Sequence, residues 1–367
     1  MQDHRRLSVS IIMPTYNRAE SLALTLGSLT TQKFPITDYE ILVVDNASTD
    51  STKLVTESLI RDNPHHQILY FYEPVPGLLS GRHRGAKEAR GTFFVFVDDD
   101  IDADPEWLQA IVETFADSSV QLVGGRNLPR YAIRPPSWLD RFWATTPYGG
   151  RACFYLSLLD LGERMLDIDA DYVWGLNFAI RRQALFDLGG FHPDVIGPDH
   201  LQYCQGDGET GLTRKANTQG YRAVYQPRAL VHHRIPASRL TPGYFERRAF
   251  FQGVCDSFTA IRRSGAVTVS APRRESLEAA GRRLVRHARY LVRHPHRFFY
   301  YRMLRRFANL KVEHIRERIQ TGYQSGYESH QRAVKGNPIL FEWVLRENYW
   351  DYHLPDLGVP RRANSSG

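Results

Sequence analysis

Short apolar runs alternate with stretches of helical periodicity in the first hundred residues. Residues 8–13, 39–44 and 93–97 are rich in Ile, Val and Phe, and each run ends at polar or turn-forming residues. Residues 18–32 and 48–62 carry apolar positions at helical spacing, and the second of them opens with helix-capping Ser, Thr and Asp. The order predicts a parallel sheet covered by helices, in which ligands bind beyond the carboxyl ends of the strands.

The pattern is less regular after the third run. Residues 105–126 predict a helix and a further strand, and residues 173–191 predict another strand and helix that end at a glycine pair. Residues 127–170, between them, are aromatic, irregular and contain four prolines. This composition is typical of a loop-rich insertion, which is where specificity elements usually lie.

The C-terminal part of the chain has a different character. An Arg-rich helical pattern begins after about residue 265, and we expect breaks at Pro295 and Gly322. The sequence therefore predicts a first domain over residues 1–264 and a mainly helical, Arg-rich region over residues 265–367.

Positive charge is concentrated in that second region. Residues 273–318 hold fourteen Arg or Lys against four Glu, so the rest of the chain is net acidic although the whole has a formal net charge of +7. Arginine interleaved with Leu, Tyr and Phe is typical of an interfacial helix that meets anionic lipid. An amphipathic hairpin that packs on the first domain, or across a dimer, fits the same pattern.

Composition places the chain among globular proteins. A chain of 367 residues that is 42% hydrophobic can bury a large core. Its three cysteines have no metal-binding or disulfide spacing, which favours a reducing compartment. No apolar run is long enough to span a bilayer or to serve as a signal peptide. We therefore expect a cytoplasmic protein, or one held peripherally at the inner membrane surface.

The ends of the three apolar runs carry the candidate chemistry. The runs end in "PTYNR" (14–18), "DNASTD" (45–50) and "DDD" (98–100), which would meet at one edge of the sheet. Adjacent carboxylates repel one another unless a cation is present, and oxygen ligands select Mg²⁺ or Mn²⁺. The spacing of Asp98 and Asp100 suits a metal that bridges to a diphosphate, and a solvated acidic turn is the alternative. Neither a dinucleotide-binding glycine motif nor a P-loop follows the first run.

Four segments together resemble the family 2 glycosyltransferases. They are "SIIMPTYNRAESLALTLGSL", "EILVVDNASTDST", "PGLLSGRHRGAKEARGTFFVFVDDD" and "WGLNFAIRRQALFDLGGF", and the resemblance covers about residues 8–262. It implies the α/β GT-A fold, with a mixed, mostly parallel sheet flanked by helices, followed here by the C-terminal helical region. It also implies an inverting, metal-dependent transfer from a nucleotide diphosphate sugar to a hydroxyl acceptor, such as a glycan or a lipid-linked sugar.

The resemblance assigns most of the candidate residues to the donor. Asp45 would hydrogen-bond the base, which a carboxylate does well, although an Asx turn with Asn46 and Ser48 is the alternative. His83 stands where Asn is common in the family. The residues assigned to the nucleotide sugar are Pro14, Thr15, Tyr16, Asn17, Arg18, Asp45, Asn46, Arg82, Asp98, Asp99, Gly175 and Asn177.

A Mn²⁺ or Mg²⁺ ion is the implied cofactor. The resemblance makes Asp100 its direct ligand and places Asp98 nearer the ribose or in a supporting position. His233 would complete the metal site or touch the diphosphate. His232 is its alternative, because only one of two neighbours in a strand faces the site.

The general base and the acceptor wall lie in two later segments. The resemblance places the base within "GDGETGL", where Glu209 takes the position and Asp207 competes; both residues could instead cap the following helix. Trp174 would stack on an acceptor sugar, or it packs in the core.

Two rival functions fit parts of the sequence. A sugar nucleotidyltransferase also gathers carboxylates and a metal at a sheet edge, but "MPTYNRAES" lacks the Gly-rich loop of those enzymes. A nucleic-acid-binding protein could use the Arg-rich segment. We expect no nucleic-acid partner, because the rest of the chain is net acidic and carries no recognisable binding motif.

Overall fold

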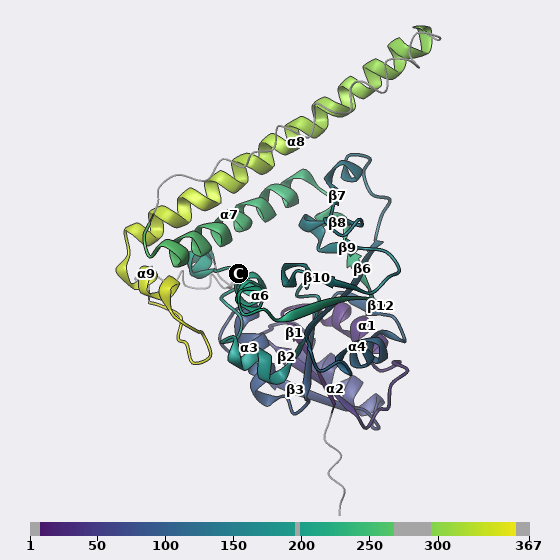
Figure 1. Cartoon of the computed structure of the whole chain (residues 1–367), viewed down its shortest axis with the longest axis vertical. Coiled ribbons are helices and arrows are strands. Elements are labelled where there is room, and N and C mark those ends of the chain that lie inside the picture. Colours follow the sequence, from purple (N-terminus) through teal and green to yellow (C-terminus); the bar gives the residue numbers. More distant parts are fainter. Residues whose placement is uncertain (1–7, 195–198, 268–294, 357–367) are drawn as a thin grey trace, which may run out of the picture.

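The computed structural model describes residues 8–194, 199–267 and 295–356 (Figure 1). A central mixed sheet has the strand order β3-β2-β1-β4-β11-β6 and continues through β9, β8 and β7. Its parallel half is formed by β1 (Val9–Thr15), β2 (Tyr39–Asp45), β3 (Gln67–Tyr72) and β4 (Phe93–Val97).

The three predicted apolar runs are confirmed as β1, β2 and β4. The strand β3 was not predicted, because it lies at the edge of the sheet and only its Ile68 is fully buried. The helices between the strands are α1 (Ala19–Leu29), α2 (Thr52–Asp62) and α3 (Leu78–Glu88).

Alternate residues of the strands face two separate cores. Ile12, Leu42 and Phe96 belong to the core that α3 covers, whereas their neighbours Ile11 and Val43 belong to the core that α1 covers. This alternation follows from the two-residue period of a strand. The helix α4 (Trp107–Phe115) joins the α1 side, and α5 (Arg182–Asp187) and α6 (Gly208–Thr218) join the α3 side.

Antiparallel strands extend the sheet on the far side of β4. β11 (Asn177–Arg181) pairs antiparallel with β4 and β6 (Val120–Tyr131), and β12 (Arg222–Ile235) runs parallel to β6. β12 also pairs with β5 (Ile101–Ala103), the short strand that follows the three aspartates. The mixed, mostly parallel sheet flanked by helices is the GT-A arrangement that the sequence predicted.

The predicted irregular insertion contains short elements. Four small strands lie in it, all in the antiparallel part of the sheet: β7 (Ala144–Thr145), β8 (Arg151–Cys153), β9 (Leu158–Asp160) and β10 (Leu166–Ile168). The 3₁₀ helices η1 (Leu139–Phe142) and η2 (Phe154–Leu156) also lie in it. Further 3₁₀ helices come later in the chain: η3 (Ala170–Tyr172), η4 (Asp199–Cys204) and η5 (Ala237–Arg239).

Three helices complete the chain: α7 (Pro242–Ser264), α8 (Pro295–Lys335) and α9 (Pro338–Leu345). The C-terminal half of α8 lies along α7 (Figure 1). The predicted break at Gly322 is wrong, because α8 runs through it without interruption. Gly322 and Gly326 instead let the two backbones approach: a Cβ at Gly326 would lie 1.9 Å from the Phe250 carbonyl oxygen.

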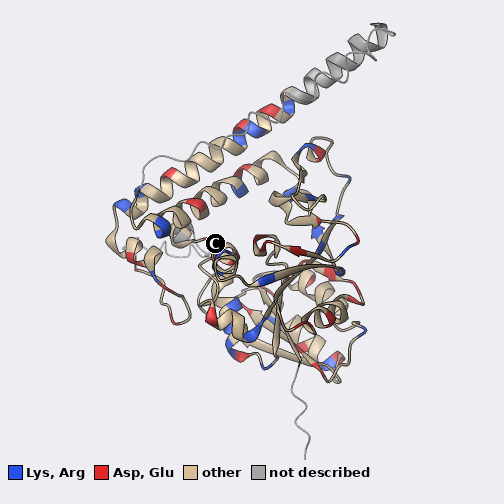
Figure 2. Ribbon diagram, viewed as in Figure 1, with Lys and Arg blue, Asp and Glu red and all other residues tan. Residues whose placement is uncertain are grey.

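The first part of the basic segment, residues 273–294, lies outside the described residues. From Leu310 onward Lys and Arg alternate with Glu along α8 (Figure 2). Among the helices of the described ranges, none has the length and apolar character that crossing a membrane requires. The boundary at residue 264 stays a prediction; α7 ends there, and α9 packs against the core on the α3 side.

Candidate active site

Polar residues from distant stretches meet at the carboxyl edge of the parallel strands. The hydroxyl of Thr15, the last residue of β1, donates to Asp99 Oδ2 at 2.6 Å. Arg18 contacts Asp99 Oδ1 at 3.1 Å and Asp100 Oδ2 at 2.7 Å. The ends of β1 and β4 therefore converge, as the strand pattern predicted.

Asp100 is buried against basic side chains. Arg239 Nη2 donates to its Oδ2 at 2.9 Å, and His233 Nε2 lies 3.4 Å from its Oδ1. Burial acts to raise the pKa of the Asp100 carboxyl, but His233 and the guanidinium groups of Arg239 and Arg18 outweigh burial and hold this pKa well below its usual range. Asp100 is therefore ionised at neutral pH.

His233 faces this carboxylate from β12. Its Nδ1 lies 2.9 Å from the Leu156 carbonyl oxygen, which leaves Nε2 directed at Asp100 and at Arg239 Nη1, 2.8 Å away. The neighbouring His232 is paired across the sheet with Asp102 instead. Asp98, Asp99 and Asp100 are called the acidic cluster. Of the two predicted alternatives, His233 is the one that reaches this cluster.

Asp100 and His233 present two atoms that could bind a divalent cation. Asp100 Oδ1 is buried and has no hydrogen-bond partner within the described part of the chain. With His233 Nε2 it makes a donor pair that suits Mg²⁺ or Mn²⁺. The described ranges contain no group of three or more His, Cys, Asp or Glu side chains that could hold a metal ion. Because Mg²⁺ usually binds one or two carboxylates and completes its shell with water and substrate phosphate, the pair fits such an ion.

The other two aspartates of the cluster have raised pKa values. Burial raises the pKa of Asp99 to about 6, against the opposing charge of Arg18. Burial and the nearby charge of Asp100 also raise the pKa of Asp98, and Arg82 and His233 oppose them. The three carboxylates are thus compensated unequally, with Asp100 the most firmly ionised.

An ion pair between α3 and α6 lies beside the cluster. Arg82 Nη1 donates to Glu209 Oε2 at 3.0 Å, and Asp194 Oδ2 lies 4.0 Å from the same nitrogen. Gly175 leaves the space for this arginine, since a Cβ there would lie 2.2 Å from Arg82 Nη2. Burial acts to raise the pKa of Glu209, but Arg82 outweighs it and lowers this pKa.

Asp207, the competitor of Glu209, has a different environment. Its Oδ1 lies 2.6 Å from His192 Nδ1, and its Oδ2 accepts from the Thr259 hydroxyl at 2.6 Å. Its side chain is 5% exposed, compared with 28% for Glu209. Asp207 is therefore held between neighbouring elements, whereas Glu209 remains partly accessible.

The segment after β2 forms a compact turn. Asp45 accepts from the Ser48 amide at 2.9 Å and from the Tyr70 hydroxyl at 2.8 Å, which is the Asx turn that the sequence left open. The Asn46 side chain donates to the Val75 carbonyl at 2.6 Å and accepts from the Gly77 amide at 2.7 Å. This turn fixes the loop that leads into α3.

The segment after β1 packs on that turn. Asn17 has a positive φ of 52°, and its Oδ1 accepts from the Thr49 amide at 2.7 Å. Pro14 lies under α3, where a Cβ at Gly81 would approach the proline Cβ to 2.9 Å. Tyr16 is 57% exposed, so it is free to contact a ligand.

Two predicted residues differ in their freedom to bind. Asn177 is buried and uses its whole amide internally, accepting from Trp107 Nε1 and donating to Asn127 Oδ1 and the Ala229 carbonyl. Trp174 is half-buried, and its Nε1 donates to the Asp171 carbonyl at 3.0 Å. Asn177 therefore acts as a buried link between β11, α4 and β12.

The sequence analysis missed two arginines, Arg234 near the end of β12 and Arg239 shortly after it. Arg234 donates to the Thr25 hydroxyl at 2.6 Å and to the Ile101 carbonyl at 2.8 Å, and it pairs with Asp102. Arg239 joins Asp100 to His233, as described above. The available signal was their position in "HHRIPASR", directly after a predicted strand that ends in a candidate ligand.

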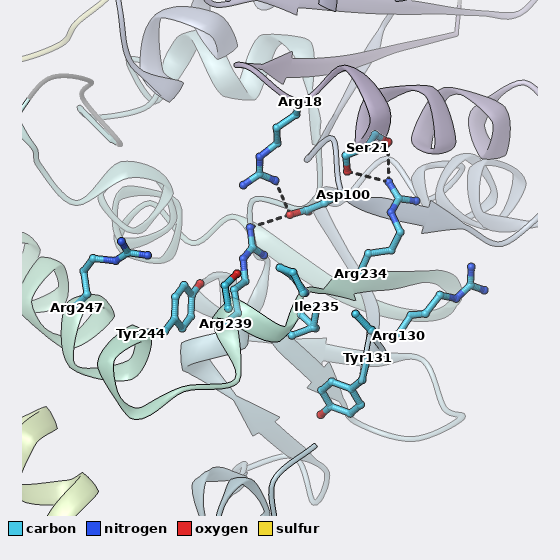
Figure 3. Close-up of a pocket in the computed structure, with 13 residues that line it drawn as sticks. Arg18, Ser21, Asp100, Arg130, Tyr131, Arg234, Ile235, Arg239, Tyr244 and Arg247 are labelled. Atoms are coloured by element: carbon cyan, nitrogen blue, oxygen red, sulfur yellow. Dashed lines mark hydrogen bonds and ion pairs between the residues drawn. The ribbon is translucent and has the colours of Figure 1, made fainter. Parts of the chain in front are cut away.

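A cavity of about 840 Å³ opens on the side of Asp100 that faces α7 (Figure 3). Its charged lining is five arginines and Asp100 alone. Arg247 makes no ion pair within the described ranges and lies 5.7 Å from the ring centroid of Tyr244. The lining is Arg18, Ser21, Asp100, Arg130, Tyr131, Ala132, Arg234, Ile235, Pro236, Ser238, Arg239, Tyr244 and Arg247. Such a cavity favours an anionic ligand.

Comparisons with known proteins point to one family. The sequence profile described as glycosyl transferase family 2 matches residues 10–189. Glycosyltransferase AglE from Haloferax volcanii is 28% identical over 218 residues, which cover 59% of this chain and 64% of AglE. Glucosyl-dolichyl phosphate glucuronosyltransferase from the same organism is 24% identical over 251 residues, which cover 67% of this chain and 75% of that protein.

A solved structure shows a weaker likeness. Mannosyltransferase PcManGT from Pyrobaculum calidifontis, in complex with GDP-Man and Mn²⁺, has a TM-score of 0.47 and 23% sequence identity. The alignment covers 71% of this chain and 65% of PcManGT.

The raised pKa of Asp99 predicts a pH-dependent gain in stability for Asp99→Asn. Its folded-state pKa, about 6, lies above the ordinary 3.8, so the ionised carboxyl costs stability above pH 6, by up to about 3 kcal/mol. We expect the variant to melt above the wild type at pH 7.5, with the difference shrinking as pH falls from 6 to 4. Thermal denaturation at pH 4, 6 and 7.5 measures this. A variant that melts below the wild type at pH 7.5 would contradict it.

Proposed function

We propose that this chain, which belongs to glycosyl transferase family 2 through residues 10–189, transfers a sugar from a nucleotide diphosphate sugar to a hydroxyl group of an acceptor with inversion. The observation that carries the proposal is the position of the Arg82–Glu209 pair beside the three aspartates at the carboxyl edge of the sheet. Inverting transfer needs one carboxylate base and a means of stabilising a leaving diphosphate. This edge offers both.

The donor would lie along the ends of β1 and β2. In this proposal, the exposed side chains of Tyr16 and Arg18 contact the nucleotide, and Asp45 binds the base through lone pairs that its turn leaves unused. Asp98 would hold the ribose. Arg82 would contact the diphosphate, since its guanidinium group is directed at the same cluster.

A divalent cation would be held by Asp100 and His233. Asp98, two residues before Asp100 in the sequence, would support the cation, as the D-x-D spacing suggests. When bound, such an ion neutralises negative charge that develops on the diphosphate as the glycosidic bond breaks. The ionised Asp100 supports this assignment, as does its Oδ1, which accepts no hydrogen bond from the described residues.

Glu209 is our choice for the general base. Its carboxylate is partly accessible and is kept ionised by Arg82, so it can accept the proton of the acceptor hydroxyl. A donor diphosphate that attracts Arg82 would weaken this ion pair and raise the proton affinity of Glu209. Trp174, half-buried beside Gly175, would form part of the acceptor wall.

The donor proposal predicts metal-dependent stabilisation by one nucleotide. A ligand that binds only the folded state raises the melting temperature by mass action. We expect one nucleoside diphosphate or its sugar to raise it by several degrees with Mn²⁺ or Mg²⁺ present, and Asp100→Ala to abolish the metal-dependent part. Asp117→Ala serves as the matched control, because Asp117 pairs with Arg222 and neither residue lines the cavity beside Asp100. No shift with any nucleotide, with or without metal, would contradict the proposal.

The cationic cavity supports an acceptor that bears a phosphate. Arg247 has no internal counter-ion among the described residues, and the cavity is within the range of about 300–1,000 Å³ that holds a whole ligand. The name of one relative, glucosyl-dolichyl phosphate glucuronosyltransferase, includes a lipid-linked sugar phosphate. A lipid-linked sugar at an anionic membrane surface would suit both this cavity and the basic segment at residues 273–318.

Arg247→Ala is predicted to weaken binding of a phosphate-bearing acceptor about 10- to 100-fold, because a hydrogen bond to a charged group contributes about 1.5–3 kcal/mol. The measurement is the affinity for farnesyl phosphate and for farnesol, with the donor nucleotide saturating. Glucose 6-phosphate in a parallel titration separates a lipid phosphate from a soluble one. Arg248→Ala, an exposed neighbour that does not line the cavity, should bind as the wild type does. Equal affinity for farnesyl phosphate and farnesol would exclude a phosphate site here.

A further inference from the structure

We propose that the C-terminal brace, residues 338–351 (α9 and the chain that follows it), is a positioning element of the active site that keeps Arg82 opposite Glu209. This inference rests on the proposed function for its catalytic consequence, and on the contacts below for its structural part. The brace contacts α3, which carries Arg82, and the segment that leads into α6, which carries Glu209.

The first contact is with His83, the residue after Arg82. His83 is 3% exposed, and its Nε2 accepts from the Phe191 amide at 3.0 Å while its Nδ1 lies 3.1 Å from the Tyr349 carbonyl oxygen. The imidazole also stacks on the Trp350 ring at a centroid distance of 4.1 Å and an interplanar angle of 21°. Both ring nitrogens and one ring face are thus occupied, and two of these three contacts come from the brace.

The contact continues from His83 to Arg82 through Phe191. The Arg82 guanidinium carbon lies 5.0 Å from the centroid of the Phe191 ring, a cation–π distance. The backbone of the same Phe191 donates to His83. A shift of His83 would therefore move both the helix turn and the aromatic ring that hold Arg82.

The backbone at Gly190 leaves room for the contact between His83 and Trp350. Gly190 has a φ of 75°, and a Cβ there would lie 2.7 Å from His83 Nε2 and 2.8 Å from the Trp350 ring. Lys87, one turn after His83, donates to the Trp350 carbonyl at 2.7 Å and to Asp351 at 2.9 Å. His83 is thus matched by residues of the brace.

The brace also holds the segment that leads to Glu209. Trp343 Nε1 donates to the Cys204 carbonyl at 2.7 Å, and the Tyr349 ring meets the edge of His192 at a centroid distance of 5.6 Å. His192 in turn binds Asp207, which immediately precedes α6 and its Glu209. The Arg82 side and the Glu209 side are therefore fixed against one common element.

The brace is itself tied to α7. Arg262 donates to the Val344 and Arg346 carbonyls at 2.5 and 2.6 Å, which satisfies carbonyls at the end of α9. The Tyr349 hydroxyl donates to the Trp343 carbonyl at 2.5 Å. These bonds fix residues 343–349 as one unit, so the loss of the Trp350 contact should release His83 without unfolding the brace.

Trp350→Ala and His83→Ala test the inference. We expect each to lower kcat on the order of 10- to 100-fold, because misplacement of a positioned group by about 1 Å can have this effect. In the pH profile of kcat/KM, the acid limb should also move to higher pH. Glu209 is faced by Arg82, with Asp98 and Asp194 as the nearby acids, and a displaced Arg82 stabilises its ionised form less. The double variant should be no worse than either single one, because both changes break one path.

A matched control separates positioning from general stability. Phe115→Ala removes a buried ring that stacks on Phe93 in the other core, at a centroid distance of 4.5 Å. It should lower the melting temperature and leave kcat per folded molecule and the acid limb unchanged. If Trp350→Ala behaves in the same way as this control, the inference is wrong.

Hydrogen exchange tests the brace independently of activity. In Trp350→Ala, peptides of residues 78–88 and 208–218 should exchange faster, and those of α1 and α4 should not change. Unchanged exchange in both peptides would overturn the inference. A wild type that turns over no nucleotide sugar would defeat the proposed function, and the exchange result would still decide whether the brace holds these helices.

Discussion

Three consecutive carboxylates at the buried end of β4 must be compensated by positive charge, and the rest of the site depends on this requirement. Arg18 at the start of α1 and Arg239 after β12 both reach Asp100. Arg234 binds the backbone of Asp99 and Ile101, and Arg82 faces Asp98. Because buried charges are costly unless they are paired, the acidic cluster determines how these elements meet.

The same arrangement suits the binding of phosphate. Guanidinium groups that are already fixed beside carboxylates need little reorganisation to meet the charge of a diphosphate. A cation that joins Asp100 and His233 would compensate the aspartates in their place. The excess of arginine in the cavity, with Arg247 unpaired among the described residues, leaves positive charge for a second anionic group.

The Arg82–Glu209 pair links this charge balance to the fold. The two residues lie 127 positions apart, and neither α3 nor α6 alone determines where they meet. Gly175 leaves room for the guanidinium group, and residues 338–351 hold both sides. The helical region after α7 therefore contributes to the site through packing, although its α9 lies more than a hundred residues from either partner.

The sequence predicted the parallel half of the sheet and its acidic edge because these depend on local pattern. Runs such as "YEILVV" and "FFVFV" are buried on both faces, and buried strands read as continuous apolar stretches. The edge strand β3 lacked that signal. Gly322 looked like a helix break because glycine is unfavourable within a helix. Its packing against Glu246 of α7 is a tertiary contact, which the local sequence does not reveal.

Site residues were predicted only where a motif marked them. Asp98, Asp99 and Asp100 form a recognisable string, but Arg234 and Arg239 look like ordinary surface arginines in the sequence. The different environments of Asp207 and Glu209 could not be predicted, because His192 and Thr259 reach Asp207 from separate segments. The role of His83 depends on Tyr349 and Trp350, 266 or more positions away.

The most direct test of the account is the turnover of the nucleotide sugar by Glu209→Gln and by Asp207→Asn, measured per folded molecule at saturating donor. The account predicts that Glu209→Gln loses about 10²- to 10⁴-fold in kcat, the usual contribution of a general base, and still binds the nucleotide. Asp207→Asn should lose stability and keep most of its kcat. Loss of turnover in Asp207→Asn with near-normal turnover in Glu209→Gln would contradict the account.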